Sequence, residues 1–576
     1  MSTTTGSRYL AEAVRAYGAS HVFMIPTIVV PALAEMDALG IEVVSTHGEK
    51  AAAYMADGYA RVSGRPGFCM SQTIGSSNLA SGLRDAAMGG SPVVALSGGS
   101  APATRYKGLY QEIEDTAAWD AVVKSTLRVD DVARLPDLLR QAVREATSGC
   151  PGPVHLQLQG TMGSVVEAEL ELGASEGAAL ADPWFSRVPA LRPAPDPALV
   201  EAAVDRIVRA ERPVIVAGGG VRLSGAAARL AAFAEAAGIP VATSLSAKGV
   251  VDETGPFAVG VVGASSRPSA NRTVERADLV VFIGCRAGSQ VTDGWRLPGP
   301  DTDVVHVDID PRELGRNHPR TLPLQADADR ALAALLERWT AVVTPPGVTR
   351  RAEWLAEVRG HVARWRADAE ALLGSDVRPV RPERLCREID RFLPDDGVLV
   401  CDTGHAGIWT AGMIDLGPTR TFIRAAGSLG WATPASMGAA AAAGDRTVVA
   451  LTGDGGFYYH LPEIETAVRH GLAPVIVVNN NQALGQDMRI FHRSWGGAER
   501  ISEAGERMWR YSPVELARVA AELGAWSVRI DDPADLGAAL HDARGSGRVA
   551  VVEVRTAAEV LPDVPYGGRD FYAAAR

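Results

Sequence analysis

Gly453-Asp454-Gly455-Gly456-Phe457, with Asn479-Asn480-Asn481 downstream, is the stretch that decides the fold of the last third of this chain. The apolar run 447–451 before it is typical of a buried strand, which the glycines end. A segment of helical spacing, 461–470, follows, and 474–478 has the pattern of a second strand. The order strand, helix, strand predicts parallel strands in an α/β sheet.

Asp454 and Asn481 therefore both follow predicted strands, at the end where open α/β sheets bind their ligands. A carboxylate and an amide oxygen suit Mg²⁺, and the glycines let the backbone approach a phosphate. The pattern predicts Mg²⁺ holding a diphosphate. Gly-Asp-Gly alone is also typical of an ordinary strand-turn-helix connection, so the argument depends on the spacing to Asn481.

That spacing resembles the thiamine diphosphate fingerprint, in which an asparagine ligates the metal 27 residues after the aspartate. The resemblance implies that Asp454, Asn481 and the backbone carbonyl of Ala483 bind the metal. Gly427 would offer its carbonyl to the 4′-amino group of the aminopyrimidine, and Leu429 would hold the rings in a bent conformation, with core packing as the alternative for Leu429. The other cofactor contacts that the resemblance implies are Gly404, His405, Gly453, Gly455, Gly456, Leu484 and Gly485.

A second match lies near the N-terminus, in Met55-Ala56-Asp57-Gly58-Tyr59-Ala60-Arg61. It resembles the pyrimidine-binding domain of acetolactate synthase-like enzymes, where a glutamate precedes the methionine by six residues, as Glu49 does here. In that family the carboxyl shares a proton with N1′ of the aminopyrimidine and so favours the imino tautomer. Gln111, in Tyr110-Gln111-Glu112, would contact a donor or acceptor substrate; a hydrogen-bonded loop amide is an equal alternative.

The chain of 576 residues is too long for one hydrophobic core, and its alternating strand and helix patterns predict three domains, each with a doubly wound parallel sheet. We expect a pyrimidine-binding domain at 1–168, a central domain at 195–342 and a diphosphate-binding domain at 378–562. The Pro- and Ala-rich stretch 166–196 is predicted to be a linker. The polar segment 486–511 has no clear strands and is predicted to be a lid.

The central domain also resembles the family, at Lys248-Gly249-Val250, Asp252-Glu253 and Asp308-Ile309-Asp310-Pro311. Gly218-Gly219-Gly220 follows a predicted strand and could hold a phosphate, but a simple tight turn is the favoured alternative. In acetolactate synthases this domain can hold FAD. The usual Arg-Phe-Asp-Asp-Arg element is replaced by Cys285-Arg286-Ala287-Gly288-Ser289-Gln290, so we do not expect FAD here. A further departure is Thr27-Ile28, where relatives have glycines. This added bulk predicts a reshaped space around the thiazolium C2 and disfavours plain acetolactate synthesis.

Composition excludes several partners. The net charge of −11 argues against a nucleic-acid ligand, and no apolar stretch is long enough to span a membrane. Five cysteines form no paired framework, and no signal peptide is visible, so we expect a cytoplasmic protein.

The resemblance implies an enzyme that decarboxylates a 2-oxo acid and passes the acyl-anion fragment to an acceptor, as a homodimer or homotetramer with active sites between subunits. The alternatives are a decarboxylase that does not ligate and an inactive regulatory homologue.

Overall fold

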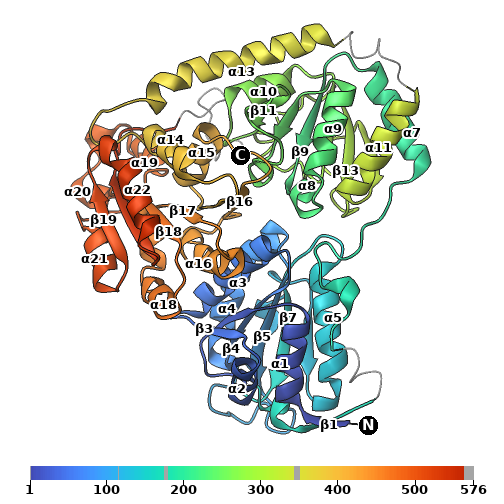
Figure 1. Ribbon diagram of the computed structural model, residues 1–576, viewed down its shortest axis with the longest axis vertical. Helices are drawn as coiled ribbons and strands as arrows, with labels where there is room; N and C mark the ends of the chain where they lie inside the picture. Colours follow the sequence, from blue (N-terminus) through green and yellow to red (C-terminus); the bar gives the residue numbers. More distant parts are fainter. Residues whose placement is uncertain (1, 114–115, 174–179, 343–350, 563–576) are drawn as a thin grey trace.

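The computed structural model describes residues 2–113, 116–173, 180–342 and 351–562, and contains three six-stranded parallel sheets flanked by helices (Figure 1). This confirms the predicted fold class. The inner strands are buried along their whole length, for example β4, β9 and β12, because helices cover both faces of each sheet. The exact domain boundaries stay a prediction.

The first sheet has the strand order β3-β2-β4-β5-β7-β6. Its strands are β2 (His21–Met24), β3 (Glu42–Ser45), β4 (Gly67–Ser71), β5 (Val93–Gly99), β6 (Thr126–Val129) and β7 (Val154–Gln159). Its helices are α1 (Gly6–Ala16), α2 (Val30–Ala38), α3 (Glu49–Ser63), α4 (Ser76–Gly89) and α5 (Leu135–Thr147).

The central sheet has the order β11-β10-β9-β12-β13-β14, in which strand order reverses beside β9. Its strands are β9 (Pro213–Ala217), β10 (Val241–Thr243), β11 (Ala258–Val261), β12 (Leu279–Ile283), β13 (Asp303–Asp308) and β14 (Thr321–Gln325). Its helices are α7 (Pro197–Arg209), α8 (Gly219–Leu223), α9 (Ala227–Ala237), α10 (Pro268–Glu275) and α11 (Ala328–Val342). The long helix α13 (Ala352–Leu373) then leads to the third domain across the top of Figure 1.

The third sheet has the order β16-β15-β17-β18-β20-β19, which repeats the connectivity of the first sheet strand for strand. Its strands are β15 (Val398–Cys401), β16 (Thr421–Arg424), β17 (Val448–Gly453), β18 (Val475–Asn480), β19 (Trp526–Ile530) and β20 (Ala550–Arg555). Its helices are α14 (Pro382–Phe392), α15 (His405–Met413), α16 (Ala432–Ala443), α17 (Asp454–Tyr459), α18 (Glu463–Arg469), α19 (Met488–Trp495), α20 (Glu503–Glu506), α21 (Leu516–Glu522) and α22 (Leu536–Gly545).

Helices α3 and α16 join the first and third domains of the same chain. They run antiparallel, with Gly58 against the backbone of Ala435 and Gly438 against the backbone of Met55. A Cβ on either glycine would collide with the facing carbonyl, so the two backbones approach as only glycine allows. One hydrophobic core runs through this contact and contains residues of both domains.

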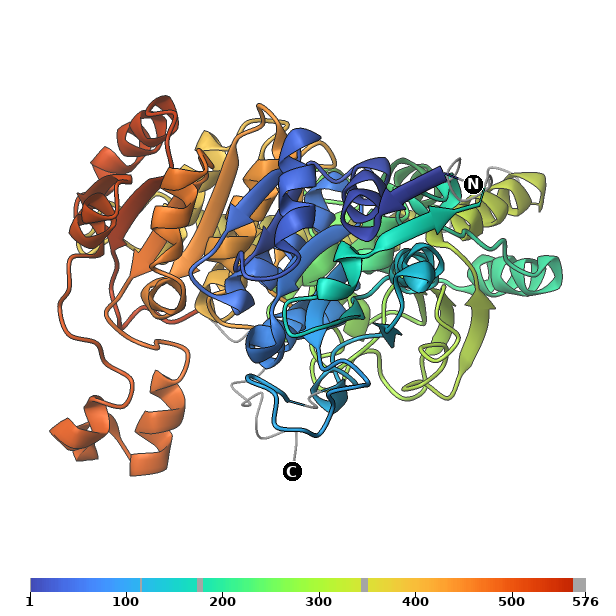
Figure 2. The same ribbon diagram turned by 90° about the horizontal axis from the view of Figure 1, so that it is seen from below.

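Two connecting segments are more ordered than predicted. Residues 166–196 include β8 (Glu169–Leu172), which pairs antiparallel with β1 (Ser2–Thr5), because Leu170 and Leu172 alternate with charged residues and pack into the first domain's core. The segment 486–511 contains α19 and α20 and projects from the third domain at the lower left of Figure 2. Within the described ranges, no helix combines the length and the apolar character needed to cross a bilayer.

Candidate functional site

Four loops meet at the carboxyl ends of the neighbouring strands β16, β15, β17 and β18. Asp402, which follows β15, links three of these loops. Its carboxylate accepts hydrogen bonds from the Gly430 N–H at 3.1 Å and from the Thr452 hydroxyl at 2.8 Å. The side chain is fully buried, and burial raises the pKa of Asp402 to about 6. The loops are therefore braced against one another before any ligand binds.

Asp454 begins helix α17 and is only 2% exposed. Its carboxylate accepts hydrogen bonds from the backbone N–H groups of Gly455 at 2.8 Å and Ala483 at 3.1 Å. Among the described residues, no Lys, Arg or His forms an ion pair with it; burial raises its pKa to about 7, and the charge of Arg555 acts against that rise. A buried carboxylate without a cationic partner is costly, and a bound divalent cation would remove that cost.

Asn481 lies beside Asp454, as the spacing of the motif predicts. The Ala483 N–H donates to the Asn481 amide oxygen as well as to Asp454, each at 3.1 Å, so both side-chain oxygens surround one backbone nitrogen. The carbonyl of Ala483 belongs to the same turn. Among the described residues, no group of three or more His, Cys, Asp or Glu side chains could hold a metal. The Asp454 set contains one carboxylate, an amide and a backbone oxygen, and these donors fit Mg²⁺.

The glycines of these loops are required by close packing. A Cβ at Gly455 would lie 2.8 Å from a Leu484 methyl, and one at Gly456 would lie 2.8 Å from an Asp402 oxygen. A Cβ at Gly485 would meet the Asn481 amide at 2.7 Å.

The two remaining predicted glycines of this cluster differ from these. Gly404 has a φ of +72°, which favours glycine, and precedes His405, whose pKa burial lowers to about 4. A Cβ at Gly453 would meet no atom within 4 Å, so its backbone is open to a ligand.

The segment 425–431 after β16, called the Gly427 segment below, borders this cluster. Gly427 is exposed and Leu429 is partly exposed, whereas Gly430 and Trp431 are buried. Leu429 belongs to none of the hydrophobic cores of the described residues, which argues against ordinary core packing. The segment thus presents one bare backbone position and one apolar side chain to the surface.

Glu49 begins helix α3 in the first domain. Its carboxylate lies directly over Gly75, where a Cβ would be 2.8 Å from the Glu49 carboxyl carbon. The nearest polar side chain is Asn78, whose amide donates to Glu49 at 3.4 Å. Glu49 is partly exposed, so it faces outward from this domain.

Gln111 lies in a second exposed part of the first domain. Its φ of +64° is unusual for a residue with a side chain, and the neighbouring Tyr110 is 83% exposed. The Glu112 carboxylate holds the loop by accepting from the N–H groups of Tyr106 at 2.6 Å and Gly108 at 2.8 Å. Within one chain, Gln111 is partly exposed, on a loop whose neighbouring side chain Tyr110 is open to solvent.

Within a single chain, Glu49 and the Gly427 segment lie far apart. Asn78 contacts Glu49, whereas Met88, ten residues later on α4, packs beside Gly427, which separates them by about 15 Å along the helix axis. The residues of α3 from Ala51 to Ala60 are all buried between these two ends. The predicted catalytic glutamate and the predicted cofactor-bending segment thus lie at opposite ends of one packed helix pair.

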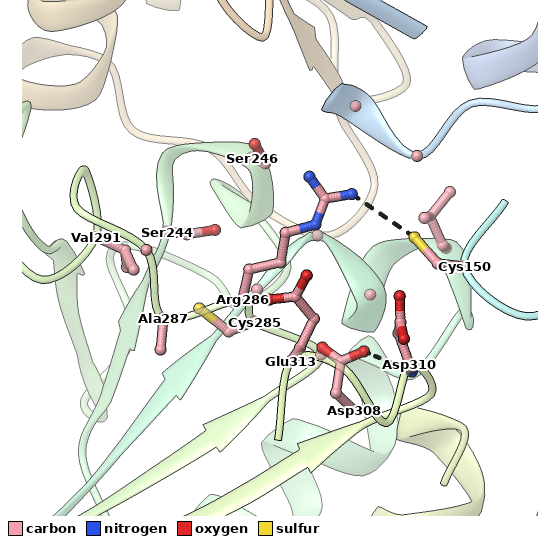
Figure 3. A pocket seen from close by; sticks show the side chains of 18 of the residues that line it. Cys150, Ser244, Ser246, Cys285, Arg286, Ala287, Val291, Asp308, Asp310 and Glu313 are labelled. Atoms are coloured by element: carbon pink, nitrogen blue, oxygen red, sulfur yellow. Dashed lines mark hydrogen bonds between the residues drawn. The ribbon is translucent and has the colours of Figure 1, made fainter. Parts of the chain in front are cut away.

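A cavity of about 530 Å³ opens between the three domains (Figure 3). Gly218, Gly219 and Gly220 line it, and Asp308 and Asp310 lie on its floor. Arg286 extends across it and donates to the Met88 carbonyl at 2.7 Å. The cavity has the size of a ligand pocket. The expectation that FAD is not bound therefore stays a prediction.

The structure also identifies residues that sequence reasoning missed or misplaced. Ile28 is fully buried in the first domain's core, so of the predicted pair only Thr27 is positioned to alter a neighbouring site. Asp402 could have been found, because it follows a strand directly as Asp454 does. Asp85 on α4 carries no motif signal, yet it binds the backbone of the Gly427 segment.

Three family models match the chain in order. The thiamine pyrophosphate enzyme N-terminal TPP binding domain matches 4–119, the central domain matches 200–335, and the C-terminal TPP binding domain matches 402–554. A probable acetolactate synthase large subunit of Methanocaldococcus jannaschii is 30% identical, over 91% of this chain and 87% of the relative. The acetolactate synthase large subunit of Corynebacterium glutamicum is 29% identical, over 98% and 89%. Glyoxylate carboligase of Escherichia coli O157:H7 is 29% identical, over 88% and 84%.

Proposed function

The chain belongs to the thiamine pyrophosphate enzyme family, as a thiamine diphosphate-dependent carboligase of the acetolactate synthase type, and from this premise we propose how its residues divide the work. We propose that it removes CO₂ from a 2-oxo acid and joins the remaining acyl fragment to a carbonyl acceptor. When bound, the cofactor's thiazolium accepts the electron pair that the departing carboxylate leaves behind.

The observation that carries the proposal is the buried carboxylate of Asp454, which has no ion-pair partner among the described residues and lies among the loops that Asp402 connects. Asp454, Asn481 and the Ala483 carbonyl would hold Mg²⁺, and Mg²⁺ would hold the diphosphate. The open backbone at Gly453 and the positive φ at Gly404 support diphosphate contacts by main-chain N–H groups. His405 stays neutral at physiological pH because burial lowers its pKa to about 4, so it would act as a hydrogen-bonding partner rather than a cation.

Glu49 would hold a proton at N1′ of the aminopyrimidine, and Gly427 would accept a hydrogen bond from the 4′-amino group. Leu429, outside the cores, would support the rings. The packing of Glu49 on Gly75 supports this role, because the carboxyl occupies the space that a Cβ at Gly75 would fill. Gln111, displayed on an exposed loop, would face the substrates.

We propose a homodimer as the minimal active unit, with a homotetramer as its further assembly. Glu49 and Gly427 of one chain are separated along α4, so Glu49 would complete the site of a second copy. The exposed Tyr106 and Tyr110 beside Gln111 support an interface here, being 81% and 83% exposed in the single chain. The described cysteines are all free thiols, which supports a reducing, cytoplasmic location.

Incubating the purified protein with Mg²⁺, thiamine diphosphate and a panel of 2-oxo acids, singly and in pairs, tests the proposal. CO₂ release with a coupled hydroxyketone or hydroxy acid, identified by mass spectrometry, is the expected result. CO₂ with free aldehyde alone would replace ligation by simple decarboxylation. No CO₂ from any acid would contradict the proposed reaction.

A further inference from the structure

Asp85 connects the first domain to the Gly427 segment of the third domain in the same chain. It lies on α4 and is fully buried. Its carboxylate accepts hydrogen bonds from three successive backbone N–H groups, those of Ala426 at 2.7 Å, Gly427 at 3.1 Å and Ser428 at 2.9 Å. Successive N–H groups that converge on one anion form a concave anion site, and here the anion is a side chain of the protein itself.

The charge of Asp85 is compensated by Arg61. This guanidinium lies 3.3 Å from the Asp85 carboxylate and also donates to the Arg424 carbonyl at 2.7 Å, one residue before the segment begins. Arg61 forms a second ion pair with Asp57, which in turn accepts from the Trp431 indole N–H at 2.9 Å. The Gly427 segment is thus held at its start by Arg61, through its middle by Asp85, and at its end by Asp57.

These contacts fix the orientation of the Gly427 carbonyl, because the peptide unit is planar. The Ser428 N–H and the Gly427 carbonyl belong to one planar trans peptide, so they point in opposite directions. Because Asp85 binds that N–H, the Gly427 carbonyl must point away from Asp85. Over the described residues, no hydrogen bond ends on the Gly427 carbonyl oxygen.

We propose that Asp85 is a positioning residue that aims the Gly427 carbonyl at the aminopyrimidine of thiamine diphosphate. This inference rests on the proposed function of that carbonyl. Gly427 is exposed and has no side chain to restrict its dihedral angles, so without Asp85 the peptide could rotate freely. Asp85 therefore acts on the pyrimidine end of the cofactor and not on the diphosphate end.

The test compares two ligands and two matched variants by titration calorimetry of the full chain in the presence of Mg²⁺. The ligands are thiamine diphosphate and inorganic diphosphate, which lacks the pyrimidine. The variants are Asp85→Asn and, as the control, Asp57→Asn, which removes an equally buried partner of Arg61. Asp57 also holds the segment, through the Trp431 side chain, but it binds none of the backbone N–H groups of 426–428, so the control separates anchoring of the segment from aiming of the peptide. We expect Asp85→Asn to weaken thiamine diphosphate about tenfold, the size of one lost hydrogen bond, and to leave inorganic diphosphate unchanged.

Three outcomes would overturn the inference: unchanged thiamine diphosphate binding, equal weakening of both ligands, or the same selective loss in Asp57→Asn. If the native protein itself fails to bind thiamine diphosphate, the proposed function fails instead, and the two failures are distinct. Should Asp85→Asn not fold, Asp85→Glu provides the same test, because it keeps the charge beside Arg61 but displaces the carboxylate by one methylene.

Discussion

The first and third domains have the same strand order, yet they carry their functional groups in opposite ways. In the third domain, the loops after three adjacent strands are bound to one another through Asp402, and Asp454 is buried among them. In the first domain, strand β3 is the equivalent of β16, and the loop after it ends at Glu49. Glu49 is partly exposed and accepts one long hydrogen bond, from Asn78 at 3.4 Å. The third domain thus holds its candidate ligand residues in interconnected loops, whereas the first domain presents a single carboxyl at its surface.

This difference teaches how one scaffold serves two roles. A diphosphate with its metal is a fixed, highly charged ligand, so a braced clamp costs no rearrangement when it binds. In the proposed dimer, a proton-sharing carboxyl would instead meet a ring held by the other subunit, so it would face outward in a single chain. The predictions below test that division, from the largest expected effect to the smallest.

Replacing the Glu49 carboxyl should slow activation of the cofactor and leave cofactor binding nearly unchanged. We expect Glu49→Gln to lower exchange of the cofactor's C2 proton by about 10²- to 10⁴-fold, the usual contribution of a general acid–base group, with little change in thiamine diphosphate affinity. Proton exchange followed by nuclear magnetic resonance in deuterated buffer gives the rate, and calorimetry gives the affinity. Exchange at the native rate would mean that another group activates the cofactor.

Replacing the buried carboxylate of Asp454 should instead weaken cofactor binding. We expect Asp454→Ala to weaken Mg²⁺-dependent binding of thiamine diphosphate by about a hundredfold or more, because even residues that only support metal ligands are worth 10- to 100-fold. The native protein treated with a chelator is the control and should resemble the variant. If the variant still binds the cofactor more tightly when Mg²⁺ is added, Asp454 is not the metal ligand.

The strands predicted from sequence and those missed show a consistent physical pattern. The inner strands are continuous apolar runs, and each of these runs was predictable because both faces of each sheet are covered. In the three six-stranded sheets the missed strands are β6, β11, β14, β16 and β19, and each one forms an edge of its sheet, although the edge strand β3 was predicted. Strands β1 and β8, which pair only with each other, were missed as well. Four of the five carry polar residues or proline, as in Thr-Leu-Pro-Leu-Gln of β14, so their pattern resembles that of a loop. The fifth, β11, is apolar but has only four residues, one of them a glycine.

Some residues of the candidate site could likewise be predicted from the sequence, and others could not. Asp454, Asn481 and the glycines around them follow predicted strands, so strand order alone places them together. Asp85 could not be predicted, because a carboxylate inside a helix gives no indication of which backbone lies across from it. Its role follows only from the packing of α3, α4 and the Gly427 segment. Likewise, Ile28 occupies a loop position by sequence but turns into the core.

A smaller change should move Glu49 without removing it. A Cβ at Gly75 would press on the Glu49 carboxyl, so we expect Gly75→Ala to lower kcat by about ten- to hundredfold, as displacement of a catalytic group by 1 Å can do. Gly48→Ala is the matched control: Gly48 adjoins Glu49, has an extended φ of −153°, and a Cβ there would meet no atom within 4 Å. Equal activity of the two variants would show that Gly75 does not set the position of Glu49.

The smallest effect concerns the contact that joins the two equivalent domains. Helices α3 and α16 follow equivalent strands, and Gly438 lets them meet backbone to backbone, so a methyl group at this position must push the helices apart. We expect Gly438→Ala to destabilise the protein by about 1–3 kcal/mol, the usual cost of overpacking, seen as a lower midpoint in a thermal melt. Gly360→Ala is the control, because Gly360 lies on exposed α13 with no atom within 4 Å of a Cβ, and the change should stabilise by about 0.5–1 kcal/mol. If Gly438→Ala melts at or above the native midpoint, the close approach of α3 and α16 does not stabilise the junction between the first and third domains.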